Sequence, residues 1–156
     1  MKKRIIALGL LWCLSAVMLQ AARVDTVLVR SAAMNKDVKV VYVLPDKAIG
    51  KQACPVVYLL HGYGGNARSW VQLKPELPQM ADEKGIIFVC PDGKNSWYWD
   101  SPENPAYRYE TFVTSELVKY TDGNYATIPD RKARAISGLS MGGHGALWSA
   151  IRHKDV

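Results

Sequence analysis

The stretch Gly138-Leu139-Ser140-Met141-Gly142 decides the fold expected for this 156-residue chain. It fits the pattern Gly-x-Ser-x-Gly, in which a strand turns sharply into a helix and exposes a serine hydroxyl at the turn. Glycines are required around the serine because backbone from both sides approaches it too closely for a larger side chain. The pattern therefore predicts that Ser140 is a catalytic nucleophile, if the rest of the sequence agrees.

A second glycine-rich stretch, HGYGG at 61–65, directly follows an apolar run at 55–60. In folds with this type of turn, the loop after an earlier strand forms the other wall of an oxyanion hole. The backbone N–H groups of Tyr63 and Met141 would then donate to the oxygen that becomes negative when a carbonyl is attacked. One such donor is worth about 3–4 kcal/mol of barrier in known hydrolases. We therefore expect Tyr63 and Met141 to form the oxyanion hole.

The hydrophobic pattern elsewhere predicts strands and helices in a characteristic order. Strands are expected at 24–29, 38–44, 55–60, 86–90 and 133–137, with a turn at 32–36 that makes the first two a hairpin. Helices are expected within 66–84, interrupted by Pro75 and Pro78, at 109–120 and at 141–153. This order predicts an α/β fold with a doubly wound, mostly parallel sheet of the α/β-hydrolase type, ending after the helix that follows Ser140.

The N-terminus has the composition of a secretory signal peptide. Lys2, Lys3 and Arg4 precede an apolar run that ends near Ala21 and Ala22, and this run is too short to span a membrane comfortably. We expect a signal peptide at 1–22, a partial domain at 23–156 and a secreted or periplasmic protein without a stable membrane anchor. Cleavage would lower the formal net charge from +6 to +3. No basic stripe with interleaved aromatic residues remains, so nucleic acid is not an expected partner.

The catalytic base is the missing part of the pattern. In this type of fold an acidic residue and then a histidine follow the nucleophile, yet only sixteen residues follow Ser140. His153 lies on the same predicted helix, roughly 20 Å away at 1.5 Å per residue, and cannot reach the hydroxyl. His61 and His144 are closer but are interpreted as structural. We therefore expect negligible esterase activity from these residues alone, together with exposed apolar surface and aggregation.

Five aromatic residues lie in or beside the segment that follows the strand at 86–90: Trp97, Tyr98, Trp99, Tyr107 and Tyr109. Ligands bind at the carboxyl ends of parallel strands, and aromatic faces there could stack on a sugar or a phenolic acyl group. Packing in the core or as a lid is an equally good interpretation. Trp97, Trp99 and Tyr107 are the candidate substrate-binding residues. Glu116, on the apolar side of the helix at 109–120, is expected to be a hydrogen-bonded structural carboxylate.

The mature sequence predicts neither a disulfide nor a metal site. Cys54 and Cys90 are expected at opposite ends of neighbouring strands, roughly 15–20 Å apart, and therefore as free thiols. No cluster of histidine, cysteine and carboxylate residues has metal-ligand spacing. No cofactor is expected.

Several motifs together resemble the esterase D-like family, which includes feruloyl esterases, S-formylglutathione hydrolases and mycolyltransferases. They are HGYGG at 61–65, PDG at 91–93, the aromatic segment, Glu116-Leu117 and ISGLSMGGHGAL at 136–147. The resemblance implies a metal-independent serine hydrolase that acts on esters through an acyl-enzyme. By position it implies that Ser140 is the nucleophile and that Tyr63 and Met141 supply oxyanion N–H groups. The acid and catalytic histidine of the family have no matching positions in this sequence.

The expected activity is therefore hydrolysis of a small-molecule or carbohydrate ester. Two alternatives remain open at this stage. An alcohol could replace water as the acyl acceptor, which would make the protein an acyltransferase. The chain could also be a non-catalytic exported remnant that retains a carbohydrate-binding surface. The sequence does not predict the acyl group, the leaving group or the oligomeric state.

Overall fold

A computed structural model describes residues 22–155. The predicted signal peptide, apart from Ala22, lies outside the described residues. Within 22–155, no helix combines the length and the apolar character needed to cross a membrane.

Five strands form one mixed sheet in the order β1-β2-β4-β3-β5. Their bounds are β1 Arg23–Ser31, β2 Lys36–Leu44, β3 Val56–Leu60, β4 Ile87–Pro91 and β5 Arg134–Gly138. β1 pairs antiparallel with β2, and β2 with β4, whereas β3 runs parallel to both β4 and β5. The predicted hairpin and the three later strands are thus confirmed, and the parallel half of the sheet contains the strand that leads to Ser140.

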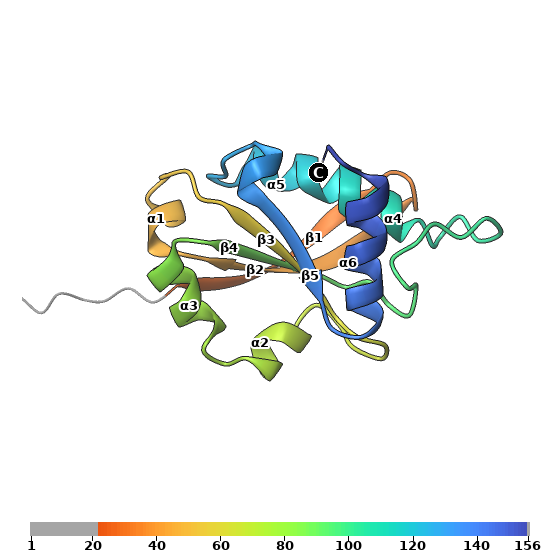
Figure 1. The fold of residues 1–156 in the computed structure, drawn as a ribbon, viewed down its shortest axis with the longest axis horizontal. Helices are drawn as coiled ribbons and strands as arrows, with labels where there is room; N and C mark the ends of the chain where they lie inside the picture. The colour runs from red at the N-terminus through yellow and green to blue at the C-terminus, as the bar shows by residue number, and fades with distance from the viewer. Residues whose placement is uncertain (1–21, 156) are drawn as a thin grey trace, which may run out of the picture.

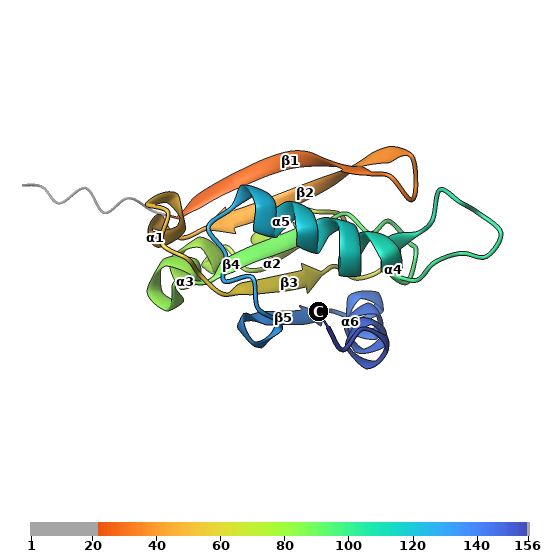
Figure 2. The same ribbon diagram turned by 90° about the horizontal axis from the view of Figure 1, so that it is seen from above.

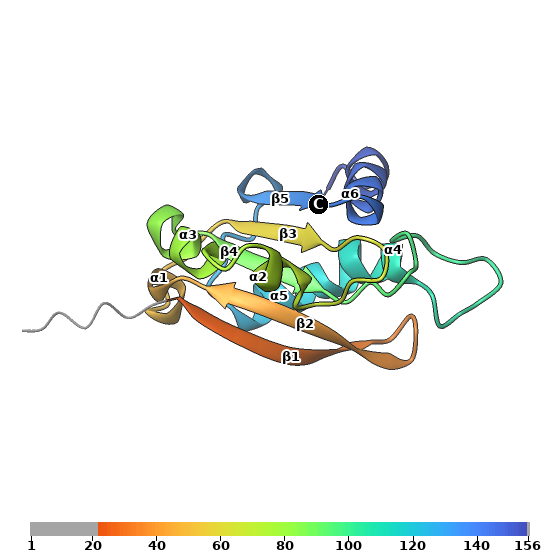
Figure 3. The same ribbon diagram turned by 90° about the horizontal axis from the view of Figure 1, so that it is seen from below.

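Helices cover both faces of this sheet, which confirms the α/β class and the doubly wound arrangement (Figure 1). They are α1 Asp46–Ile49, α2 Ser69–Leu73, α3 Leu77–Lys84, α4 Tyr109–Thr111, α5 Leu117–Asn124 and α6 Met141–Arg152. A π-helical turn, η1 (Phe112–Glu116), joins α4 to α5, and a 3₁₀ turn, η2 (Arg131–Ala133), precedes β5. α4 to α5 cross one face (Figure 2), while α2 and α3 lie on the other (Figure 3).

Successive side chains of a strand point to opposite faces of the sheet, so the apolar residues form two cores, one on each face. Val40 and Tyr42 of β2 pack with the η1–α5 side, where Val113 and Leu117 are buried. Their neighbours along the chain face the α2–α3 side, in a second cluster that includes Phe88, Leu77 and Ala81. Cys54 and Cys90 are both buried and free, as expected. The continuous apolar runs in the sequence therefore correspond to strands covered on both faces.

Three details differ from the sequence prediction. The region 66–84 forms two helices, and Pro78 lies in the first turn of α3, where its missing N–H is tolerated, rather than interrupting it. The short helix α1 was not predicted. The helix expected at 109–120 continues to Asn124 and contains the π-helical turn η1. Such turns are rare and frequently occur at functional sites.

One side of the described fold exposes apolar surface. β5 pairs only with β3 among the described strands, so its other edge presents free backbone groups. On the neighbouring helix α6, Leu147 and Ile151 are 68% and 71% exposed. They are four residues apart and therefore lie on one side of the helix. The free edge and the exposed apolar side chains each favour self-association.

We expect the L147Q/I151Q double variant to associate less than the wild-type chain. Removing two large apolar side chains lowers the free energy gained when such surfaces meet. Size-exclusion chromatography with light scattering at several concentrations measures this. Leu28→Gln is the matched control, since Leu28 is 62% exposed on β1, away from β5 and α6. An equal change in the control would show that the surface beside β5 has no special role.

Candidate active site

Ser140 lies at the turn between β5 and α6 in a strained backbone conformation. Its φ and ψ are 54° and −115°, and its side chain is exposed. A positive φ is uncommon for a residue other than glycine and costs conformational free energy. This is the conformation in which a sharp strand-to-helix turn presents a serine hydroxyl.

The two glycines of the turn are required by close backbone contacts. A Cβ atom at Gly138 would lie 2.3 Å from the carbonyl carbon and oxygen of Gly142. A Cβ at Gly142 would lie 2.1 Å from the carbonyl oxygen of Leu60, at the end of β3. Real Cβ atoms do not approach backbone this closely, so the turn could not close with larger residues. The physical reason given for these glycines is therefore confirmed.

The HGYGG loop lies beside Ser140. A Cβ at Gly62 would be 3.6 Å from the Cβ of Ser140, so the loop and the turn are in contact. Within residues 22–155, the N–H groups of Tyr63 and Met141 have no hydrogen-bond partner. The Tyr63 side chain is exposed, whereas the Met141 side chain is buried in the core. The structure thus brings three of the predicted site residues to one location.

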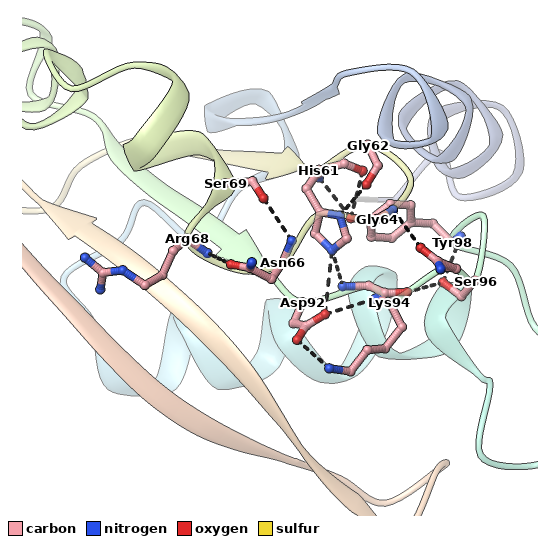
Figure 4. Close-up of polar contacts among 12 residues, drawn as sticks. His61, Gly62, Gly64, Asn66, Arg68, Ser69, Asp92, Lys94, Ser96 and Tyr98 are labelled. Atoms are coloured by element: carbon pink, nitrogen blue, oxygen red, sulfur yellow. Dashed lines mark hydrogen bonds and ion pairs between the residues drawn. The ribbon is translucent and has the colours of Figure 1, made fainter.

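His61 supports this loop from below (Figure 4). Its Nδ1–H donates to the carbonyl of Gly62 at 2.7 Å, and its Nε2 accepts from the N–H of Gly93 at 2.9 Å. These two bonds define a neutral imidazole with the proton on Nδ1. Asp92 Oδ1 lies 3.7 Å from Nε2, too far for a hydrogen bond.

The nearby Asp92 carboxylate remains charged although it is buried. Burial alone would raise the pKa of Asp92, but the ammonium and the backbone N–H of Lys94 lower it below its usual value. The Lys94 ammonium lies 2.9 Å from Oδ2 of Asp92. The loop after β4 thus carries an ion pair next to His61.

No histidine is hydrogen-bonded to Ser140 within residues 22–155. Both ring nitrogens of His61 are engaged by backbone groups. His144 donates from Nδ1 to the carbonyl of Trp97 at 3.2 Å. His153 donates from Nε2 to Oε1 of Glu110 at 2.8 Å. Each histidine therefore has a structural contact, and none is placed as a general base for the Ser140 hydroxyl.

The five aromatic residues after β4 divide between the two interpretations. Trp97, Trp99 and Tyr107 are 44%, 50% and 36% exposed, whereas Tyr98 and Tyr109 are buried in the core. The Trp97 ring meets the His144 ring edge-on, with centroids 5.4 Å apart. The exposed rings are thus available to a ligand, and the buried ones have a packing role.

Two carboxylates tie the helices to the rest of the fold. Glu116 accepts from the Ser31 hydroxyl at 2.5 Å and from the Ala33 N–H at 2.8 Å, which agrees with its expected structural role. Glu110, which sequence reasoning missed, is buried and links α4 to α6. It accepts from Trp148 Nε1 at 2.7 Å, Arg152 Nε at 2.8 Å and His153 Nε2 at 2.8 Å.

The charge of Glu110 is stabilised by these three donors. Burial raises its pKa, but the hydrogen bonds from Trp148, Arg152 and His153 outweigh this and lower the pKa. Its partners lie about forty residues further along the chain, so no local pattern could have revealed the network. A carboxylate at the start of an amphipathic helix was the only available signal.

Comparison with known proteins identifies the family. A family model described as "Putative esterase" matches residues 31–156. The chain belongs to this esterase family. Its structure also resembles the S-formylglutathione hydrolase of Agrobacterium tumefaciens, with a TM-score of 0.76 at 27% identity over 88% of this chain and 57% of that one. The fold is therefore that of the α/β-hydrolases.

The curated relatives include an esterase and an acyltransferase. An acetyl esterase from Caldicellulosiruptor saccharolyticus is 28% identical over 79% of this chain and 48% of its own length. A diacylglycerol acyltransferase/mycolyltransferase from Mycobacterium gordonae is 32% identical over 85% of this chain and 40% of its own length. The chain thus spans about half the length of the curated relatives that it matches.

We expect Gly142→Ala to destabilise the fold by about 3 kcal/mol, because overpacking against rigid backbone is at the costly end of its range. The free energy of unfolding in urea measures this. Gly123→Ala is the matched control: it lies in α5, and an added Cβ meets nothing within 4 Å. Alanine should stabilise that helix by about 0.5–1 kcal/mol. Equal stability of the two variants would contradict the close contact at Leu60.

Proposed function

We propose that this chain carries the nucleophile and the oxyanion hole of a serine esterase, with Ser140 as the nucleophile. The observation that carries the proposal is the strained, exposed Ser140 in contact with the HGYGG loop. Two unpartnered N–H groups, those of Tyr63 and Met141, accompany it. Membership of the esterase family supports the same chemistry.

In the proposed reaction, Oγ of Ser140 attacks the carbonyl carbon of an ester while a base removes the hydroxyl proton. The carbonyl oxygen becomes an oxyanion that accepts hydrogen bonds from the N–H groups of Tyr63 and Met141. The C–O bond to the alcohol breaks, and the alcohol leaves with the proton. Water then attacks the acyl-enzyme, which releases the acid and restores Ser140.

The base is the group that the described residues do not supply. A serine hydroxyl without a base is a weak nucleophile. For residues 1–156 alone we therefore expect negligible turnover, although binding and an oxyanion hole by themselves give some rate enhancement. An external base should restore part of the reaction.

The proposed substrate is a small-molecule or carbohydrate ester. Its sugar or phenolic ring would contact Trp97, Trp99 and Tyr107. The exposure of these three side chains after β4, at the carboxyl end of the parallel strands, supports this assignment. The acyltransferase relative favours acyl transfer as a second candidate, in which an alcohol replaces water. A non-catalytic carbohydrate-binding remnant is the alternative if Ser140 does not react.

The proposed location is secreted or periplasmic, and the proposal rests on the signal-peptide pattern at 1–22. A basic start followed by a short apolar run is the feature that supports it.

The test of the nucleophile uses imidazole as an external base. We expect nitrophenyl acetate to release nitrophenol slowly with the chain alone, and faster with imidazole present. The increase caused by imidazole should be absent in the Ser140→Ala variant, apart from the direct reaction of imidazole with the ester, which this variant measures. Peptide mass spectrometry should locate an acetyl group on Ser140. Lack of Ser140-dependent release with imidazole would contradict the proposal, and strong release without imidazole would mean that a histidine already present acts as the base.

We expect Trp97→Ala and Trp99→Ala each to weaken ester binding about fivefold, because a favourable aromatic contact is worth about 1 kcal/mol. The ester concentration that gives half-maximal acylation of Ser140 measures this. The substitution Leu28→Gln on β1 serves as the control. Unchanged half-saturation in both tryptophan variants would remove these residues from the substrate site.

A further inference from the structure

The buried side chain of Tyr98 is accommodated by strained backbone at its own position and by glycines on neighbouring segments. The φ of Tyr98 is 58°, and that of the preceding Trp97 is 56°. Two successive non-glycine residues in the left-handed region are costly, and such strain persists only where the surroundings enforce it. The hydroxyl of Ser96 helps to enforce it, since it accepts from the N–H of Tyr98 at 3.1 Å and donates to the carbonyl of Gly93 at 2.6 Å.

Two glycines on different elements make room for the Tyr98 side chain. A Cβ at Gly93, just after β4, would lie 2.2 Å from Cε1 of Tyr98. A Cβ at Gly145, in α6, would lie 2.6 Å from its Cβ. The ring therefore fills the space between the loop after β4 and helix α6, which begins directly after Ser140.

The hydroxyl of Tyr98 reaches a third element. It accepts from the backbone N–H of His61 at 2.9 Å and donates to the carbonyl of the same residue at 3.3 Å. His61 opens the HGYGG loop, and its ring meets that of Tyr98 edge-on at 5.8 Å. Burial raises the pKa of Tyr98, so the hydroxyl keeps its proton and can serve both bonds. Figure 4 shows Tyr98 and His61 on neighbouring loops, with these contacts between them.

The geometry points to Tyr98 as a positioning residue that fixes the distance between the two halves of the oxyanion hole. One proposed donor, the Tyr63 N–H, belongs to the loop that Tyr98 holds through His61. The other, the Met141 N–H, belongs to α6, against which Tyr98 packs at Gly145. A single rigid side chain thus contacts both elements, and preorganised donors act only when their spacing suits the developing oxyanion.

The effect of Tyr98 on the acylation of Ser140 rests on the proposed function. The effect of Tyr98 on the conformation of the HGYGG loop does not, and it holds whether or not Ser140 reacts. The experiment therefore has two arms, one for the loop and one for acylation.

The first arm is amide hydrogen exchange, followed by mass spectrometry, of the full chain and its Tyr98→Phe variant. Phenylalanine keeps the ring and removes the hydroxyl, which leaves the buried His61 N–H without its partner. We expect exchange in peptides that cover 61–65 to quicken about tenfold. Tyr42→Phe is the matched control, since Tyr42 is also fully buried and its hydroxyl bonds Thr121 at 2.9 Å, away from the loop.

The second arm measures Ser140 acylation by nitrophenyl acetate with imidazole. We expect Tyr98→Phe to lower the maximal rate about tenfold, with the half-saturating ester concentration unchanged. Tyr42→Phe should leave the maximal rate unchanged. A general structural role would instead lower the thermal stability of both variants alike and leave the rate per folded molecule unaltered.

Unchanged exchange at 61–65 in Tyr98→Phe, or an equal change in Tyr42→Phe, would overturn the assignment of Tyr98. Absence of Ser140 acylation in every variant would overturn the proposed function instead, and the exchange arm would then decide the role of Tyr98 on its own.

Discussion

The backbone contact between the end of β3 and the turn at Ser140 determines the rest of the site. Leu60 pairs with Gly138 in the parallel register of β3 and β5, so the HGYGG loop and the serine turn leave the sheet from adjacent positions. The carbonyl of Leu60 accepts from the Leu139 N–H at 3.2 Å, and Gly142 passes close above it. Ser140 and its neighbouring loop are therefore positioned by strand register before any side chain contributes.

The loop after β4 adds what strand register alone does not provide. β4 pairs with β3 on the side opposite to β5. The segments that follow these three adjacent parallel strands therefore meet at the carboxyl ends of the strands. From this loop, Gly93 donates to His61 and Asn95 Oδ1 accepts from the Gly64 N–H at 2.8 Å. A glycine-rich loop is intrinsically flexible. These contacts from a neighbouring strand are what hold it in one conformation.

The parts of the fold that depend on local patterns could be predicted from the sequence, whereas the parts that depend on distant partners could not. Buried strands such as β3 follow from continuous apolar runs, and the turn at Ser140 follows from its glycines. By contrast, no periodicity separates buried Tyr98 from exposed Trp97 and Trp99, because the left-handed residues at 97 and 98 break the regular alternation of side chains. Glu110 was missed because its partners lie on a helix formed much later in the chain.

The same distinction explains why the proposed chemistry divides into two parts. Placing a hydroxyl next to oxyanion donors needs only short turns and adjacent strands, and residues 22–155 contain these. Removing its proton needs a base at hydrogen-bond distance, and the histidines at 61, 144 and 153 are each engaged by another group. Moving His61 toward Ser140 would cost the two backbone bonds that support the loop. In the proposed mechanism, the base therefore has to come from outside the described residues, and the site built here is the half that orients the reacting atoms.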